Sequence, residues 1–248
     1  MSAIGIGLIV LVCVFGGSLL GMFLHTILPE HHLSSDSKDV IKLGMGLIAT
    51  MSALVLALLT NSAKGSFDTQ RNELTQMSAS IILLDRVLAH YGPETKDARD
   101  LLKGTVANMI NRMWPDEGHG PQLEPVAAEA FYDKIQALSP QNDVQRQLQA
   151  QAVKISVDIG QARWLLFEQG GRSIPMPFLV LLIFWVTVIF LSFGLFAPRN
   201  ATVIVTLFLC ALSLSGAIFL ILELDRPFGG LVQISSASLR SALAQIDK

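Results

Sequence analysis

The sequence predicts an all-α integral membrane protein, with four transmembrane helices per subunit and a helical water-soluble domain. The chain of 248 residues is 51% hydrophobic and only 15% charged, which is too apolar for an ordinary soluble domain. Its apolar residues also gather in four windows of about the 20 residues that are needed to cross a bilayer. These windows, which contain little or no charge, are residues 4–28, 43–60, 174–196 and 201–222.

The first window is expected to be an uncleaved span and not a secretory signal. No Lys or Arg precedes its apolar stretch, and no convincing small-x-small cleavage site follows it. Pro29 ends this span, because proline cannot continue the hydrogen-bonded ladder of a helix. The polar stretch 30–39, which contains His31 and His32, is expected to form the first loop.

The second span is expected to continue out of the membrane as one long helix, because no proline follows it until Pro93. Its soluble part carries an apolar seam at steps of three and four residues: Leu74, Met77, Ile81, Leu84, Leu88 and Tyr91. A second seam precedes the third span: Leu148, Ala152, Ile155, Ile159, Ala162 and Leu166. The two seams are expected to pack against one another or against neighbouring subunits.

Shorter helices are expected between these two seams, near residues 98–113 and 125–138, because a Pro and Gly cluster at 115–121 separates them. Residues 197–200 join the third and fourth spans as a tight hairpin, in which the Asn200 side chain can cap the fourth helix. The expected division is a first helix pair (1–60), a helical domain (61–173), a second helix pair (174–222) and a tail (223–248).

The distribution of charge predicts the orientation of the chain. With four spans, only Lys38, Lys42 and Arg199 of the 18 Lys and Arg residues lie opposite the two termini and the middle domain. Because positive residues favour the cytoplasmic side, both termini and the middle domain are expected in the cytoplasm. The net charge of -2 and the absence of a sustained basic run argue against nucleic-acid binding.

One face of the second span is small or weakly polar and ends in a cation. Such a face can line a narrow pore that attracts anions at its charged end, or it can let two helices approach closely. Both interpretations stay open at this point. The face consists of Gly46, Thr50, Ala53, Ala57, Thr60, Asn61 and Lys64.

Polar and small residues elsewhere in the spans indicate packing and anchoring. Gly17 and Gly21 form a GxxxG pair, which is typical of close helix packing in membranes. Glu223, Asp225 and Arg226 follow the fourth span directly, and we interpret them as an interfacial charge cluster that anchors the helix end.

Catalytic residues, a metal site and a cofactor are not expected. The five histidines (His25, His31, His32, His90 and His119) lack the carboxylate or thiol spacing of a metal site. Cys13 and Cys210 both fall inside predicted spans, where they cannot form a framework of surface disulfides. Small apolar packing is the expected role of both cysteines.

Two segments carry a family resemblance: residues 67–74 (FDTQRNEL) and residues 222–229 (LELDRPFG). Together with the paired spans, they resemble the bacterial bestrophin-like domain family, over nearly the whole chain. The resemblance implies a homo-oligomer, a pentamer by analogy with bestrophins, in the lipid of the bacterial inner membrane. It also implies a channel for small anions such as chloride, with the second span lining the pore.

The sequence departs from bestrophins in two places. Gly230-Leu231-Val232 follows Pro227-Phe228-Gly229, where calcium-responsive bestrophins have a run of acids. Calcium gating through that element is therefore not expected. No aromatic residue occurs between Leu43 and Asn61, so the second span lacks the aromatic neck of bestrophin pores.

Three functions remain under comparison. The leading hypothesis is an anion channel, with Lys64 as an electrostatic attractor. The main alternative is a non-conducting scaffold or signalling protein that recruits a soluble partner through its cytoplasmic helices, with residues 74–91 as the segment on which binding would depend. The last is an enzyme or proton-coupled carrier using Glu223 and Asp225, which lacks a second acidic or histidine site at the membrane midplane.

Overall fold

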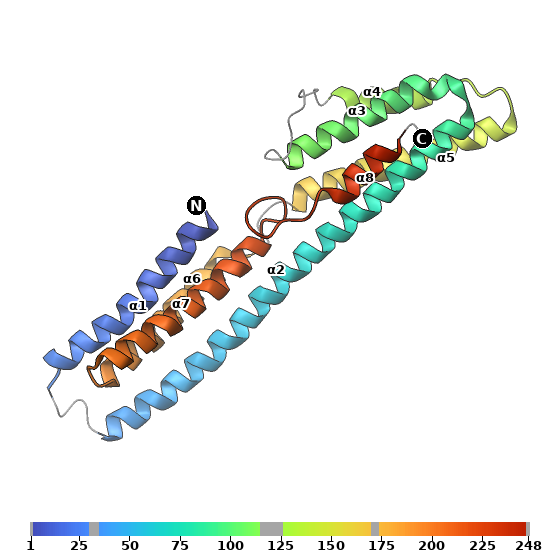
Figure 1. The fold of residues 1–248 in the computed structure, drawn as a ribbon. Helices are drawn as coiled ribbons and strands as arrows, with labels where there is room; N and C mark the ends of the chain where they lie inside the picture. The colour runs from blue at the N-terminus through green and yellow to red at the C-terminus, as the bar shows by residue number, and fades with distance from the viewer. Residues whose placement is uncertain (1, 30–34, 115–125, 170–173, 247–248) are drawn as a thin grey trace. The chain divides into compact units, whose positions relative to one another are not determined.

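The computed structural model describes residues 2–29, 35–114, 126–169 and 174–246, and within these ranges every regular element is helical. The α-helices are α1 (Ala3–Ile27), α2 (Ser35–Tyr91), α3 (Lys96–Met113), α4 (Val126–Gln136), α5 (Asp143–Gln169), α6 (Met176–Phe196), α7 (Ala201–Leu224) and α8 (Ala237–Gln245), with a 3₁₀ turn at Pro93–Thr95 (Figure 1). The predicted all-α fold class is confirmed.

The chain divides into two compact units. Unit 1 contains Met1–Ser66 and Arg172–Asp225, and unit 2 contains Phe67–Gly171 and Arg226–Lys248. Helix α2 contributes its first part to unit 1 and its last part to unit 2. Four helices among the described residues are long and apolar enough to cross a membrane, namely α1, α2, α6 and α7. Each of them overlaps one of the four windows that the sequence predicts as spans, to within two residues at the ends of α1 and α6.

Within unit 1, helix α1 packs closely against α6 and α7. A Cβ atom added at Gly21 would overlap the carbonyl oxygen of Leu191, and one added at Gly194 would overlap the carbonyl oxygen of Ser18. Only glycine fits such an approach, which places the two backbones in direct contact. The packing interpretation of the GxxxG pair is therefore confirmed. On the α7 side, Ser215 Oγ donates a hydrogen bond of 2.6 Å to the Gly7 carbonyl oxygen.

The hairpin between α6 and α7 has the predicted cap. The Asn200 side-chain oxygen accepts a hydrogen bond of 2.8 Å from the backbone N–H of Val203. This bond satisfies one of the free N–H groups in the first turn of α7. The same hairpin is tied to α1, because the Arg199 guanidinium donates a hydrogen bond to the Met22 carbonyl oxygen.

Unit 2 is built around the two predicted seams. The residues of the α2 seam are at most 4% exposed, and both seams belong to one apolar core that also contains residues of α3, α4 and α8. The seams therefore pack within the chain. Helix α8 was not expected from the sequence, and it contributes the buried Leu239 and Ala242 to this core.

Two sets of hydrogen bonds join the elements around the core of unit 2. Trp114 donates its indole N–H to the Ile234 carbonyl oxygen at 2.8 Å, which ties α3 to the segment before α8. Asp85 of α2 is buried, and its carboxylate accepts two hydrogen bonds from the Arg99 guanidinium, at 2.7 and 3.1 Å. A two-bond pair of this kind fixes the orientation of α3 on α2 as well as its position.

Candidate pore-lining site on helix α2

The part of α2 in unit 1 has three faces of different character. The first face packs inside the unit: Ser52, Leu59 and Ala63 are buried, and Val55 and Leu56 are half-buried. The apolar members of this face share a core with residues of α6 and α7. This face therefore holds α2 in the unit, and the remaining circumference of the helix faces outward.

The second face is the small-residue face predicted from the sequence. At 100° per residue, the seven residues lie within about 60° of one line along the helix, away from the packed face. All seven are exposed in the single chain: Gly46, Thr50, Ala53, Ala57, Thr60, Asn61 and Lys64. The structure thus brings the predicted residues together on one open surface, and their role in a pore stays a prediction.

The low buried share of its apolar window distinguishes α2 from the other three spans. Only 11% of the apolar window of α2 is buried, compared with 39% for α1, 39% for α6 and 22% for α7. A Cβ added at Gly46 would meet no atom within 4 Å, so no neighbouring helix requires the glycine. Within the described chain, close packing therefore does not explain why these small residues occur on α2.

The hydroxyl groups of the two threonines on this face donate hydrogen bonds to backbone carbonyl oxygens of α2 itself. Thr50 Oγ1 donates to the Gly46 carbonyl oxygen at 2.9 Å, and Thr60 Oγ1 donates to the Leu56 carbonyl oxygen at 2.8 Å. Each hydroxyl then offers only its oxygen lone pairs to whatever lies next to the face. The positive charge of Lys64 and the amide N–H groups of Asn61 are thus the groups of this face that can attract an anion.

The third face of α2 is leucine-rich and was missed in the reading of the sequence. It lies beside the small-residue face, and its members are between 45% and 77% exposed: Val40, Leu43, Leu47, Met51, Leu54 and Leu58. Their spacing of three and four residues is visible in the sequence and could have revealed a second stripe. Such a surface requires lipid or another protein chain to cover it.

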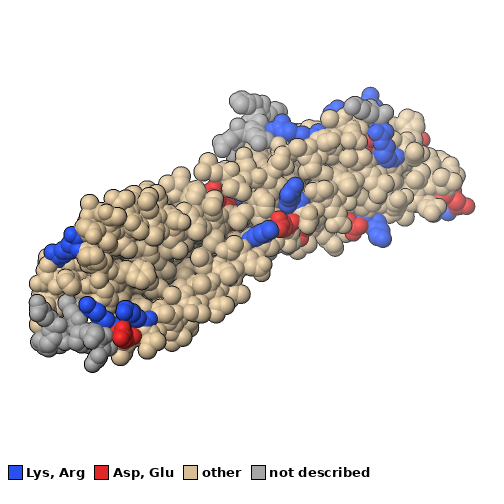
Figure 2. Space-filling view, turned by 60° about the horizontal axis from the view of Figure 1, so that its bottom comes forward, with Lys and Arg blue, Asp and Glu red and all other residues tan. Residues whose placement is uncertain are grey.

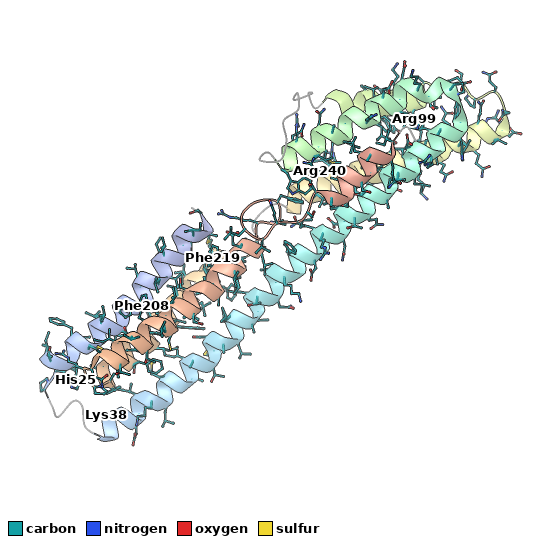
Figure 3. The ribbon with its side chains drawn as sticks, viewed as in Figure 1. His25, Lys38, Arg99, Phe208, Phe219 and Arg240 are labelled. Atoms are coloured by element: carbon teal, nitrogen blue, oxygen red, sulfur yellow. The ribbon has the colours of Figure 1, made fainter. Side chains whose placement is uncertain are left out.

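Basic residues gather where α2 begins. His25, at the end of α1, and Lys38, near the start of α2, lie at the same end of unit 1 (Figure 3). Lys38 Nζ lies 5.9 Å from the centre of the Phe196 ring, and Lys42 pairs with Asp39 at 3.1 Å. On the face that Figure 2 shows, the surface over the spans is almost free of charge, with Lys and Arg concentrated at their end.

The predicted charge cluster lies at the opposite end of the same spans. Glu223 is buried in the last turn of α7, and the backbone N–H of Asp225 donates to the Ile221 carbonyl oxygen as the helix ends. Arg226 follows in the next segment. All three residues have interaction partners in the structure. Their action as an interfacial anchor remains a prediction.

The described residues contain no group of three or more His, Cys, Asp or Glu side chains that could hold a metal ion. Cys13 and Cys210 are free thiols on the exposed surface of α1 and α7. His31, His32 and His119 lie outside the described residues. Among the described side chains, the small-residue face of α2 is the surface on which the predicted functional residues come together.

The family comparison and the structure comparison both match this chain to bestrophin-like proteins. The bestrophin-like domain family matches residues 12–239. A crystal structure of a bacterial bestrophin homologue from Klebsiella pneumoniae has the same fold, with a TM-score of 0.63 and 13% sequence identity. The similarity covers 94% of this chain and 97% of that chain. No curated protein matches the sequence.

Proposed function

The chain is a member of the bestrophin-like family, and we propose that it is one subunit of a homo-oligomeric channel that conducts small anions such as chloride. The observation that carries this proposal is the open small-residue face of α2. A pore helix must leave its axial face uncovered in the single subunit, and small residues on that face leave room for an ion to pass. All seven residues of the face are exposed, and the six before Lys64 are small or polar.

The leucine-rich face supports assembly. In a ring of subunits, each α2 has one face toward the axis and a flank toward the next subunit. The exposed leucines lie beside the small-residue face, where such a flank would be, so in a ring they would pack against the next subunit in place of lipid. We propose a homo-oligomer on this basis; the pentameric state comes from the likeness to bestrophins.

Preference for anions is assigned to Lys64 and Asn61. The threonine hydroxyls of the pore face have already donated their protons to the backbone, so they supply no donors to a passing anion. A ring of Lys64 side chains raises the local concentration of anions at one mouth of the pore. The middle of the face, which includes Ala53 and Ala57, offers no hydrogen-bonding side chain to an ion and is the natural barrier to conduction.

The proposed orientation places both termini and unit 2 in the cytoplasm of a bacterium, with the spans in the inner membrane. Lys38, Lys42 and Arg199 are then the cations of the outer side, and Lys64 lies near the inner mouth. In this orientation Glu223, Asp225 and Arg226 lie at the inner interface.

The alternative is a scaffold that recruits a partner through its cytoplasmic helices, and the apolar seam of residues 74–91 is not available to it as a docking surface. The apolar seam on this segment is buried in the core of unit 2, against residues of α3, α5 and α8. A partner could reach the seam only by unfolding that core. Conduction is the function that the exposed residues favour.

Anion flux through proteoliposomes tests the proposal. The wild-type chain is expected to release trapped chloride or iodide, and Lys64→Glu is expected to lower the flux about tenfold by replacing the attracting charge with a repelling one. Lys154→Glu, at an exposed position on α5, makes the same change of charge in unit 2 and is expected to leave the flux unchanged. A wild-type flux equal to that of empty liposomes would reject conduction.

A further inference from the structure

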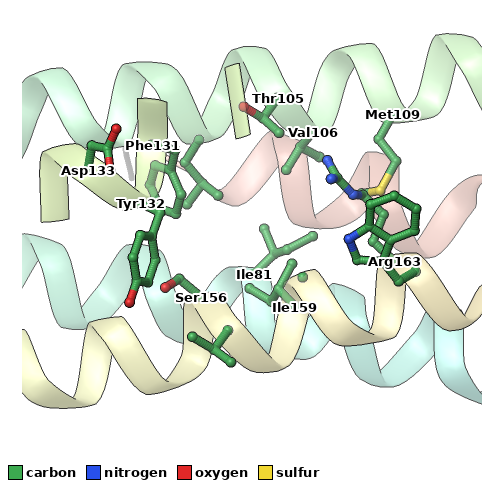
Figure 4. Close-up of a pocket in the computed structure, with 14 residues that line it drawn as sticks. Ile81, Thr105, Val106, Met109, Phe131, Tyr132, Asp133, Ser156, Ile159 and Arg163 are labelled. Carbon is green, nitrogen blue, oxygen red and sulfur yellow. The ribbon is translucent and has the colours of Figure 1, made fainter. Parts of the chain in front are cut away.

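A cavity of 470 Å³ lies entirely within unit 2, between α2, α3, α4 and α5. Its volume is in the range of sites that hold small organic molecules. The proposed conduction assigns no role to it. Figure 4 shows the lining side chains, which come from four helices and converge on the space between them.

The body of the cavity is apolar. Ile81 of α2, Val106 and Met109 of α3, Phe131 of α4 and Ile159 of α5 contribute to its walls. An aliphatic or aromatic group would find contacts on several sides in this space. The walls therefore favour a ligand with a compact apolar body.

The two charged side chains of the lining, Asp133 and Arg163, lie at opposite ends of the cavity (Figure 4). Tyr132 and Asp133 are at one end, and Arg163 is at the other (Figure 4). Asp133 is exposed to water, whereas Arg163 is half-buried. Water screens the carboxylate of Asp133 strongly, so the cation is the charge that a ligand inside the cavity would feel more.

The three hydroxyl groups of the lining take part in local hydrogen bonds, and of these only Tyr132 keeps its own proton free to donate. Thr105 donates to the Leu101 carbonyl oxygen at 2.8 Å, and Ser156 donates to the Val153 carbonyl oxygen at 2.7 Å. The Tyr132 hydroxyl accepts from the Gln136 amide at 2.7 Å. For the guanidinium of Arg163, in contrast, the described side chains provide no hydrogen-bond or ion-pair partner. Its planar array of N–H donors fits a carboxylate.

Gly160 of α5 adds room to the wall. It lies one helical turn from Arg163, and a Cβ added there would meet no atom within 4 Å. Glycine is unfavourable in the interior of a helix, and here no neighbouring backbone requires it. A larger side chain at this position would therefore enter open space without displacing a packed group.

We propose that this cavity binds a small amphipathic anion, with its carboxylate on Arg163 and its apolar body against the walls formed by α3, α4 and α5. A cationic ligand would bring a second positive charge close to the half-buried Arg163. A neutral apolar ligand would fill the same space but would form no ion pair with the guanidinium. The site does not depend on conduction, so flux measurements and binding measurements fail or succeed separately.

Calorimetric titration of the full chain in detergent tests the site with a matched pair of probes. The anion is 1-naphthylacetate, and its neutral counterpart is 1-naphthylacetamide. The wild type is expected to bind the acetate saturably and about tenfold more tightly than the amide. Arg163→Gln is expected to remove this difference by weakening acetate binding about tenfold, with amide binding unchanged.

Two substitutions at Gly160 test the location. Gly160→Leu is expected to weaken binding of both probes by taking up part of the cavity beside Arg163, and Gly160→Ala, which adds only one methyl group, is expected to retain it. Thermal unfolding of the variants shows whether each is folded. Absence of saturable acetate binding to the wild type would overturn the proposal. So would unchanged binding to folded Gly160→Leu, or an Arg163→Gln effect of equal size on both probes.

Discussion

The contact between α1 and α6 and the exposed face of α2 contain the same kinds of small residue but use them in opposite ways. At Gly21 and Gly194 any side chain would overlap a backbone carbonyl of the facing helix. At Gly44 and Gly46 of α2 an added Cβ would meet nothing within 4 Å. Small residues thus indicate close packing in the first region, and in the second they leave a surface open for something outside the subunit.

The largest expected effect is the loss of the α1–α6 contact. Gly21→Val would force the two backbones apart, at a cost of about 3 kcal/mol in the free energy of unfolding, the upper end for overpacked cores. Gly16→Val is the matched control on the same helix, because an added Cβ at Gly16 meets no atom within 4 Å. Thermal unfolding in detergent is the measurement. Equal melting temperatures for the two variants would show that the contact is not tight.

A bulky residue on the open face of α2 should leave stability intact and reduce conduction. Gly46→Phe places a large ring where the structure has free space, and in the proposed pore it would narrow the path and lower anion flux about tenfold. Leu8→Phe makes an aromatic substitution at an exposed position on α1, to which neither the pore nor the assembly is assigned. Anion flux through proteoliposomes should fall for Gly46→Phe alone. Equal flux in the two variants would show that Gly46 does not line the pore.

The smallest effect is expected for the threonine hydroxyls. Thr50→Val removes a hydroxyl whose proton is already donated to the Gly46 carbonyl oxygen, so the chloride permeability relative to sodium should change by less than about twofold. Reversal potentials across a salt gradient measure this ratio. A large loss of chloride preference would mean that Thr50 turns its proton toward the ion.

Much of this contrast could be predicted from the sequence, because local rules govern it. Hydropathy located the four spans, the side-chain oxygen of Asn200 marked the start of α7, and the spacing from Leu74 to Tyr91 marked the core of unit 2. Gly17 and Gly21 were likewise recognised as packing residues. Each of these features leaves a local or periodic pattern in the sequence, even where the residue contacts a distant helix.

Features that depend on distant segments could not be predicted. The small residues from Gly46 to Lys64 fitted both packing and a pore, because the sequence does not say which helix, if any, covers them. The cavity near Arg163 needs four helices to form, and the role of Gly160 is visible only when they are in place. Helix α8 is short, and its buried Leu239 and Ala242 form a pattern too brief to stand out.

Thiol accessibility in the spans tests the central claim, that the small-residue face of α2 lies in water. In a background with Cys13→Ser and Cys210→Ser, the measurement is the block of anion flux by a charged methanethiosulfonate at Ala53→Cys, with Ser52→Cys on the packed face as control. The account predicts a rapid block at Ala53→Cys and none at Ser52→Cys. A conducting Ala53→Cys channel that is insensitive to the reagent would contradict it.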